Sequence, residues 1–374
     1  MRIALNALTL LSPLTGVGNY TFQLARRFPE LSPANDYTYY YGYFSHRLIA
    51  VNEAVNSAKK SLTDIPYVKP TLRRFVNLGS KFHLKPFDIY FEPNFIPLSI
   101  RAKRVVTTIH DFTFLIHPES QPKERMDYFR REFYRRIARS DSIITDSAYV
   151  MNEARGFLKL PTVPITPIHL GVDHELFKPI DRALLSRFKA DTGLSNSFIL
   201  YVGTLEPRKN VSRLLQAYLE LPAQTKNEFQ LVLVGAKVGD DRDIARVMER
   251  AKDRIRYLGF LGQKELPYIY NLASAFVFPS LYEGFGLPPL EAMACGCPVV
   301  VSKAAALPEV CGDAAQYVDP DDAASIANGI QGVLSDERLR RDLIERGCQR
   351  IKNFTWEKTA REILKVFYDV SDEG

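Results

Sequence analysis

The chain has 374 residues, of which 46% are hydrophobic and 25% charged. This balance is typical of a folded protein, and the length allows two separate cores. The first residues lack the apolar stretch of a signal peptide, and no run of about 20 apolar residues predicts a membrane span. Four cysteines without paired histidine spacing indicate reduced thiols rather than disulfides. We therefore expect a cytoplasmic protein of two domains.

The net charge of +6 is unevenly distributed. Residues 1–180 hold 24 Lys and Arg against 16 Asp and Glu, whereas residues 181–374 hold 25 against 27. Within the first half, the segment 123–139 places Phe129, Phe133 and Ile137 four residues apart, with arginines between them. This spacing predicts a core-facing helix with a cationic exterior. That exterior is either a peripheral contact with anionic lipid at the inner face of a membrane or a solvated surface. No recognition motif accompanies the charge, so we expect no nucleic-acid partner.

The first half alternates predicted strands with helices. The strands are expected at residues 2–7, 37–44, 88–91, 105–109, 142–145 and 165–170. A turn containing Gly16 and Gly18 precedes a helix expected at 20–28. The tyrosine-rich run 37–43 resembles a sugar-stacking platform, but aromatic residues in a half-buried strand explain it better. The alternation predicts a parallel sheet covered on both faces.

The same pattern restarts after about residue 175. Strands are expected at 198–203, 229–235, 255–259, 275–279 and 298–302, with a helix at 211–219. The fold class is therefore α/β, with two Rossmann-like doubly wound domains. The first would span residues 1–175 and the second residues 176–355, with an interdomain cleft at the carboxyl ends of the strands.

The most informative motif spans residues 282–298. Gly284 and Gly286 allow close backbone approach to a ligand, and the prolines at 288 and 289 suit the first turn of a helix whose positive end binds phosphate. Glu283 precedes that helix and Glu291 lies within it, so the two carboxylates cannot form one glycosidase-like pair. They suit hydroxyls at the two ends of an elongated ligand. The alternative is a plain helix start with incidental glutamates.

Further polar residues follow predicted strands. Arg208 and Lys209 come after the first strand of the second domain, where adjacent cations suit a diphosphate. Gly16 and Gly18 offer backbone donors in the first domain, and His110 ends a strand where the cleft is expected. Acidic groups at 240–243 and 319–322 are candidate metal ligands, but a helix start at the first segment and a turn at the second explain them better. We predict no metal site.

These motifs together resemble glycosyltransferase family 4, the retaining GT-B enzymes that include bacterial mannosyl- and rhamnosyltransferases of surface polysaccharide synthesis. The resemblance covers nearly the whole chain. It is carried by Glu283-Gly-Phe-Gly-Leu-Pro-Pro-Leu-Glu291 and by Gly203-Thr-Leu-Glu-Pro-Arg-Lys-Asn210. Supporting segments are 257–260, 307–312, 317–320 and 354–360. The first-domain match is looser.

The resemblance implies roles for individual residues. Arg208 and Lys209 would bind the donor diphosphate and Glu291 the nucleotide ribose, while Glu283 and His110 would lie beside the transferred sugar. The remaining donor-binding positions that it implies are Gly203, Thr204, Leu258, Phe260, Leu261, Gly284, Phe285, Gly286 and Leu287. Thr204 stands where some members carry a second arginine. A closing helix over 356–374 would pack back on the first domain.

The implied reaction is transfer of a hexose with retention, without a metal or other cofactor, by front-face substitution in which the leaving phosphate accepts the proton of the acceptor. GDP-mannose is the favoured donor, with a deoxysugar such as rhamnose as a variant. The acceptor would be a lipid-linked saccharide in the synthesis of O-antigen or another surface polysaccharide. We expect Lys209→Ala and Glu283→Ala to abolish transfer and leave folding intact. The alternatives are a GT-B-fold sugar-nucleotide epimerase and a non-catalytic nucleotide-sugar-binding paralogue.

Overall fold

The computed structural model describes residues 1–12, 16–49, 85–120, 123–194, 197–237, 246–249, 251 and 253–372. The chain divides into two compact units. Unit 1 comprises Met1–Phe112, Gln121–Gly171 and Trp356–Gly374, and unit 2 comprises Thr113–Ser120 and Val172–Thr355. The division differs from the predicted boundaries in two ways. Unit 2 resumes at Val172 rather than at 176, and it also includes the short segment Thr113–Ser120 from the first half.

Unit 1 contains one sheet of seven strands. These are β1 (Arg2–Asn6), β2 (Asp36–Tyr40), β3 (Phe44–Ser45), β4 (Phe87–Glu92), β5 (Ala102–Ile109), β6 (Ser142–Thr145) and β7 (Ile165–Pro167), in the order β3-β2-β1-β4-β5-β6-β7. All neighbours are parallel except β2 and β3. The single strand predicted over 37–44 is therefore wrong, because the chain bends at Gly42 (φ 92°) and returns antiparallel.

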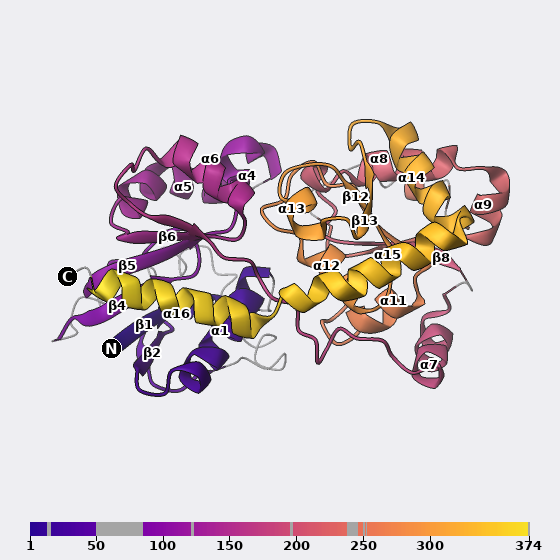
Figure 1. The fold of residues 1–374 in the computed structure, drawn as a ribbon. Coiled ribbons are helices and arrows are strands. Elements are labelled where there is room, and N and C mark those ends of the chain that lie inside the picture. Colours follow the sequence, from indigo (N-terminus) through magenta and orange to yellow (C-terminus); the bar gives the residue numbers. More distant parts are fainter. Residues whose placement is uncertain are drawn as a thin grey trace, which may run out of the picture. The chain divides into compact units, whose positions relative to one another are not determined.

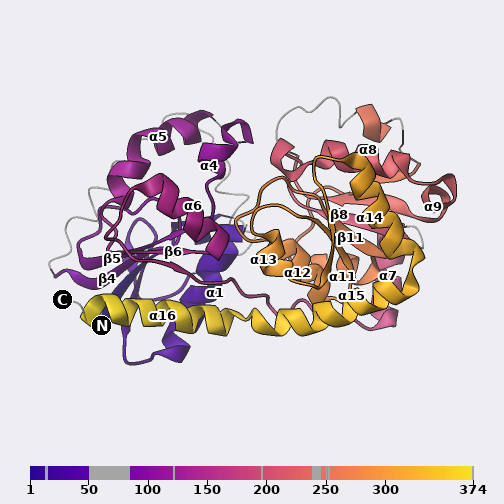
Figure 2. The same ribbon diagram turned by 45° about the horizontal axis from the view of Figure 1, so that its top comes forward.

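Helices cover both faces of this sheet. They are η1 (Leu8–Leu11), α1 (Gly16–Leu31), α5 (Lys123–Ile137), α6 (Ala148–Leu158) and α16 (Trp356–Asp372). In Figures 1 and 2, α5 and α6 lie on one face, and α1 and α16 lie side by side on the other. Phe367 of α16 packs against Phe28 of α1 and Phe91 of β4, with ring centroids 5.6 and 5.2 Å apart. Burying such a side chain contributes about 1.5–3 kcal/mol, which fixes the closing helix to unit 1.

Unit 2 contains a fully parallel sheet of six strands. These are β8 (Phe198–Val202), β9 (Gln230–Val234), β10 (Ile255–Tyr257), β11 (Ala275–Phe278), β12 (Val299–Ser302) and β13 (Ala315–Val318), in the order β10-β9-β8-β11-β12-β13. The central strands are continuous apolar runs, as expected for a parallel sheet buried on both faces. The sequence analysis did not predict β13, a short edge strand whose residues Gln316 and Tyr317 are only partly buried.

The helices of unit 2 include two short ones from the first half of the chain. The helices are α4 (Thr113–Ile116), η2 (Pro118–Ser120), α7 (Arg182–Thr192), η3 (Pro207–Lys209), α8 (Val211–Glu220), α9 (Ala223–Glu228), α11 (Leu266–Leu272), α12 (Leu287–Ala294), α13 (Leu307–Cys311), α14 (Ala323–Ser335), α15 (Glu337–Arg350) and η4 (Ile351–Asn353). In Figure 1, α8 and α14 cover one face of the sheet, and α11, α12 and α15 the other. The predicted fold class of two doubly wound α/β domains is confirmed.

Candidate active site

The topology of unit 2 marks one position at the carboxyl edge of its sheet. The chain runs from β8 outward to β9 and β10, and then returns to place β11 on the other side of β8. Ligands of open α/β sheets bind at such a switch point, outside the carboxyl ends of the strands. The loops that follow β8 and β11 meet there, since the Leu281 amide donates a hydrogen bond to the Arg208 carbonyl (2.9 Å). These two loops carry Arg208, Lys209 and Glu283.

Two cations surround the Glu283 carboxylate. Lys209 Nζ lies 2.6 Å from its Oε1, and Arg208 Nη1 lies 3.1 Å from its Oε2. Arg208 also donates to the Tyr282 carbonyl (2.6 Å) and pairs with Glu206 (2.7 Å). The side chains of these four charged residues are only 10–13% exposed. The structure thus brings together three of the predicted site residues and adds Glu206, which the sequence analysis did not identify.

Charge compensation sets the protonation states in this cluster. Burial alone would raise the pKa of Glu283, but the nearby charges of Lys209 and Arg208 outweigh it, so the pKa lies below its usual value. Burial lowers the pKa of Lys209, and its pairing with Glu283 opposes this shift. Two cations and two carboxylates leave the cluster neutral. An anion that replaces Glu283 as the partner of the cations would therefore find positive charge already in place.

The local sequence explains how the cations reach this position. Asn210 ends η3 in the left-handed conformation (φ 61°), which asparagine tolerates well. Its side chain donates to the carbonyls of Pro279 (3.0 Å) and Pro320 (2.7 Å), so it ties the loop after β8 to the loop after β11. The Lys209 ammonium lies 5.1 Å from the centre of the Phe278 ring. An asparagine directly before a predicted helix start was the sequence signal for this role.

Helix α12 begins beside the cluster. Gly286 caps it with φ 119°, and a side chain there would lie 2.7 Å from the Leu307 side chain, so only glycine fits without strain. Gly284 is buried, and the buried Phe285 ring packs 5.9 Å from Phe354. Leu287 is the first residue of α12. The structure therefore places the predicted helix start four residues after Glu283.

Glu291 lies one turn further along α12. It accepts a hydrogen bond from Tyr270 (3.0 Å), and burial raises the pKa of Glu291 to about 7 despite this bond. No sequence pattern linked Tyr270 to Glu291. The carboxylates of Glu283 and Glu291 have different partners, as expected for two separate binding contacts.

The other predicted residues of unit 2 lie in loops at the same edge. Gly203 and Thr204 follow β8, and the Thr204 carbonyl accepts from Tyr201 (3.1 Å). Leu258, Phe260 and Leu261 follow β10. The Leu258 amide donates to the Leu233 carbonyl (3.0 Å), and Phe260 is 69% exposed, so its ring is accessible to a ligand.

The remaining predicted residues belong to unit 1. Gly16 and Gly18 form the first turn of α1 rather than a turn before a helix, so the predicted start at residue 20 was four residues late. His110 follows β5 and is buried. Its Nδ1 lies 2.7 Å from Asp146, and its Nε2 lies 2.8 Å from the Pro93 carbonyl. Both partners accept, so both ring nitrogens donate, and neither is available for proton transfer unless a hydrogen bond breaks.

Electrostatics favour a charged His110. Burial lowers the pKa of the imidazole, but Asp146 and the Pro93 carbonyl outweigh it and raise the pKa above its usual value. Asp146 holds His110 in place and was not identified from the sequence. The other oxygen of Asp146 is buried without a hydrogen-bond partner.

Unit 1 has a switch point of its own between β1 and β4. Asn6 ends β1 and donates to both oxygens of Glu92 (2.9 and 2.8 Å), which ends β4. Tyr90 and the Asn94 amide also donate to this carboxylate, at 2.5 and 3.1 Å. Burial raises the pKa of Glu92 to about 7. The sequence analysis missed this pair, because neither residue lies in a motif.

Three further expectations concern surfaces and metals. The tyrosines of β2 and Tyr41 are buried, which agrees with the structural interpretation of the run 37–43, whereas Tyr43 at its end is 58% exposed. Arg130, Arg131 and Arg135 of α5 are about 70% exposed, as its predicted cationic exterior requires. None of the described helices is long and apolar enough to cross a membrane. The described residues also contain no group of three potential metal ligands, and the acidic segment 240–243 lies outside them.

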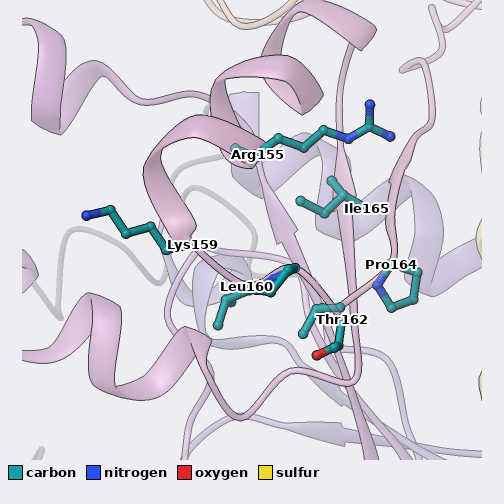
Figure 3. Close-up of a pocket in the computed structure, with 9 residues that line it drawn as sticks. Arg155, Lys159, Leu160, Thr162, Pro164 and Ile165 are labelled. Atoms are coloured by element: carbon teal, nitrogen blue, oxygen red, sulfur yellow. The ribbon is translucent and has the colours of Figure 1, made fainter.

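A pocket of about 650 Å³ lies away from all of these residues. It is lined by residues 154–155 and 159–165, at the end of α6 and the start of β7. These are at the amino-terminal side of β7, whereas His110 lies at the carboxyl edge of the sheet. Figure 3 shows the Arg155 and Lys159 side chains extending in opposite directions, so their charges do not converge on one ligand. We assign this pocket no function.

Family models match both halves of the chain. The model "Glycosyltransferase Family 4" matches residues 14–176, and the model "Glycosyl transferases group 1" matches residues 185–350. The chain is 32% identical over 367 residues to O-antigen chain mannosyltransferase B of Escherichia coli, covering 95% of this chain and 96% of that protein. It is also 32% identical over 286 residues to the E. coli serotype-specific mannosyltransferase WbdA, covering 73% of this chain but only 34% of WbdA.

Solved structures agree on the fold. Sucrose-phosphate synthase from Thermosynechococcus elongatus matches with a TM-score of 0.70 at 19% identity, over the full length of both chains. The Anabaena protein HepE, solved with UDP and glucose, matches with a TM-score of 0.67 at 16% identity, covering 99% of this chain and 100% of that one. Both matches support the GT-B class that the sequence predicted. With the family models and the full-length relative, they show that this chain is a glycosyltransferase and belongs to glycosyltransferase family 4.

Proposed function

We propose that this protein transfers mannose from GDP-mannose, with retention of the anomeric configuration, to a lipid-linked saccharide in the synthesis of O-antigen or a related surface polysaccharide. The observation that carries the transfer chemistry is the buried cluster of Arg208, Lys209 and Glu283 beside the start of α12. The choice of mannose rests on the full-length similarity to O-antigen chain mannosyltransferase B.

The cluster suits a diphosphate leaving group. The two cations pair with the carboxylates of Glu206 and Glu283, and the helix start adds positive potential. When the phosphates bind, Arg208 and Lys209 stabilise the charge that develops as the glycosidic bond breaks. Glu283 is then released to accept hydrogen bonds from hydroxyls of the transferred sugar. Glu291 accepts hydrogen bonds from the ribose hydroxyls.

One feature of the cluster supports the proposal of retention. Glu283 is held by two cations, which makes it a poor nucleophile. The proton of the acceptor would therefore pass to the leaving phosphate on the same face of the sugar. This route needs no metal, and we propose that the enzyme uses none.

Donor selection is tested with the purified full chain in EDTA. Thermal unfolding is measured with GDP-mannose, UDP-glucose, UDP-N-acetylglucosamine and dTDP-rhamnose in separate samples, together with slow donor hydrolysis. We expect selective stabilisation by GDP-mannose. Selective stabilisation by dTDP-rhamnose would mean that rhamnose is transferred instead of mannose, with the same mechanism. Binding only in the presence of a divalent ion would contradict the metal-free route.

The acceptor proposal has its own test. The exposed arginines of α5 suit an anionic membrane surface, where a lipid-linked acceptor is found. We expect the protein to sediment with vesicles containing anionic lipid at low salt and to remain in solution with neutral vesicles. Equal behaviour with both kinds of vesicle would count against the peripheral contact.

A further inference from the structure

One histidine near the cluster has no role in the function proposed above. His117 lies between α4 and η2, in the short segment Thr113–Ser120 that belongs to unit 2. Its amide donates to the Thr113 carbonyl (2.8 Å), which holds the residue at the end of one helical turn. Its ring packs against the ring of Tyr282, with centroids 5.9 Å apart and planes inclined by 50°. Tyr282 directly precedes Glu283.

A carboxylate orients the His117 ring. Nδ1 lies 3.1 Å from Oε1 of Glu119. A carboxylate oxygen accepts, so Nδ1 carries the hydrogen and, in the neutral ring, Nε2 is an acceptor. Within the part of the chain that the structure describes, Nε2 makes no hydrogen bond. The side chain is 23% exposed, so a ligand can reach this ring.

The surroundings decide which kind of ligand suits this nitrogen. Glu119 bonds directly to the ring, and Glu283 follows the tyrosine on which the ring packs. Two carboxylates disfavour an anion at Nε2, and a neutral imidazole nitrogen needs a donor. A hydroxyl group meets both conditions. Arg208 holds the Tyr282 carbonyl at 2.6 Å, so the tyrosine is fixed next to the predicted sugar contact at Glu283.

We propose that His117, oriented by Glu119, accepts a hydrogen bond from a hydroxyl of the transferred sugar and so contributes to donor selection. This inference rests on the proposed function, because it assumes that the sugar lies beside Glu283. It assigns His117 to sugar recognition and Glu119 to positioning of the ring. The diphosphate and the nucleoside are bound by other residues and do not depend on His117.

The test compares two ligands on the same protein. The first is the nucleotide sugar that the wild type binds among the four donors named above, and the second is its nucleoside diphosphate. We expect His117→Ala to lower the affinity for the nucleotide sugar about three- to tenfold, which is the effect of one lost hydrogen bond. The affinity for the nucleoside diphosphate should not change. His117→Gln keeps an acceptor oxygen and should recover part of the loss. Glu119→Gln should lower the affinity for the nucleotide sugar by less than His117→Ala does.

Matched controls separate recognition from structure. His46 pairs with Asp36 at 3.3 Å on the surface of unit 1 and is 74% exposed, so His46→Ala should change neither affinity. Unchanged binding of the nucleoside diphosphate shows that each variant is folded. A deoxy donor that lacks the recognised hydroxyl should bind wild type and His117→Ala equally well.

The outcomes that overturn the proposal are distinct. An equal loss of affinity for both ligands in His117→Ala would show that the residue only supports the loop after β11. An unchanged affinity for the nucleotide sugar would show that His117 does not contact it. If the wild type binds none of the four nucleotide sugars, the proposed function fails and this inference fails with it. That failure is seen in the wild type, before any variant is measured.

Discussion

Each of the two sheets has a buried carboxylate at its switch point, and the two are held in opposite ways. Glu283 of unit 2 lies between Lys209 and Arg208, at 2.6 and 3.1 Å. Glu92 of unit 1 accepts from neutral donors, including Asn6 at 2.8 Å. The pKa of Glu283 is consequently lowered by its cations, whereas burial raises the pKa of Glu92 to about 7. The proposed diphosphate would therefore compete with Glu283 for its two cations, whereas neutral groups of unit 1 donate to Glu92.

The largest effect should follow from removing a cation of unit 2. Lys209→Ala leaves Arg208 alone to stabilise the leaving diphosphate, so we expect kcat/KM to fall about 100- to 1,000-fold, the usual cost of one lost transition-state contact. The measurement is transfer of labelled sugar to acceptor. Lys352→Ala is the control, because that lysine is exposed and donates a hydrogen bond to the Gln349 side chain (2.7 Å), away from the charged cluster. Turnover within threefold of wild type would contradict the assignment of the cluster.

The burial of this cluster changes one expectation from the sequence. Removing one partner of a buried ion pair commonly costs about 3–5 kcal/mol, so Glu283→Ala should lose stability as well as transfer. Glu283→Gln keeps the shape and frees both cations. We expect it to bind the nucleoside diphosphate more tightly than wild type while transfer is lost. Weaker binding of the nucleoside diphosphate by this variant would mean that Glu283 does not compete with the phosphates.

The next prediction concerns Glu92 and the stability of unit 1. Because its pKa is raised to about 7, the unfolded carboxyl ionises first as the pH rises, and the folded state loses stability between about pH 4.5 and 7. The loss reaches about 3 kcal/mol. Glu92→Gln cannot ionise, so its free energy of unfolding should lack this decline. Urea unfolding at pH 5, 6, 7 and 8 measures the difference, and parallel pH profiles for both proteins would contradict the prediction.

The sequence predicted the elements that periodicity defines. Buried strands made mainly of apolar residues, such as β8 and β12, were found within one or two residues of their bounds. The edge strand β13 and the hairpin at Gly42 were missed, because half-exposed residues and a single bend carry little periodic signal. Segment Thr113–Ser120 was placed in the wrong unit, since only tertiary packing assigns it.

The candidate site was predictable where residues lie in one motif. Arg208, Lys209 and Glu283 were identified, but their mutual pairing was not, because 74 residues separate Lys209 from Glu283. The sequence analysis did not identify the partners that lie outside the motifs. Tyr270 and Asp146 are ordinary residues in the sequence, and their function comes only from the side chain that each one contacts. Local patterns thus indicate candidate binding residues, and the fold determines which side chains hold them in place.

The smallest of the predicted effects concerns Glu291, a carboxylate of unit 2 whose pKa is also raised. Desolvation raises the pKa of Glu291 to about 7, although Tyr270 donates a hydrogen bond to its carboxylate. The ionised carboxylate of Glu291 accepts hydrogen bonds from ribose hydroxyls better than the protonated form does. Nucleotide binding should therefore favour the ionised form of Glu291. Between pH 6 and 8 the ionised fraction rises about tenfold, and the affinity for GDP-mannose should rise by a similar factor. This donor is chosen because its diphosphate does not titrate in that range. Glu291→Gln should bind weakly and without pH dependence. An affinity of the wild type that does not change with pH would contradict the contact between Glu291 and the ribose, and would indicate that Glu291 serves the fold through its bond to Tyr270.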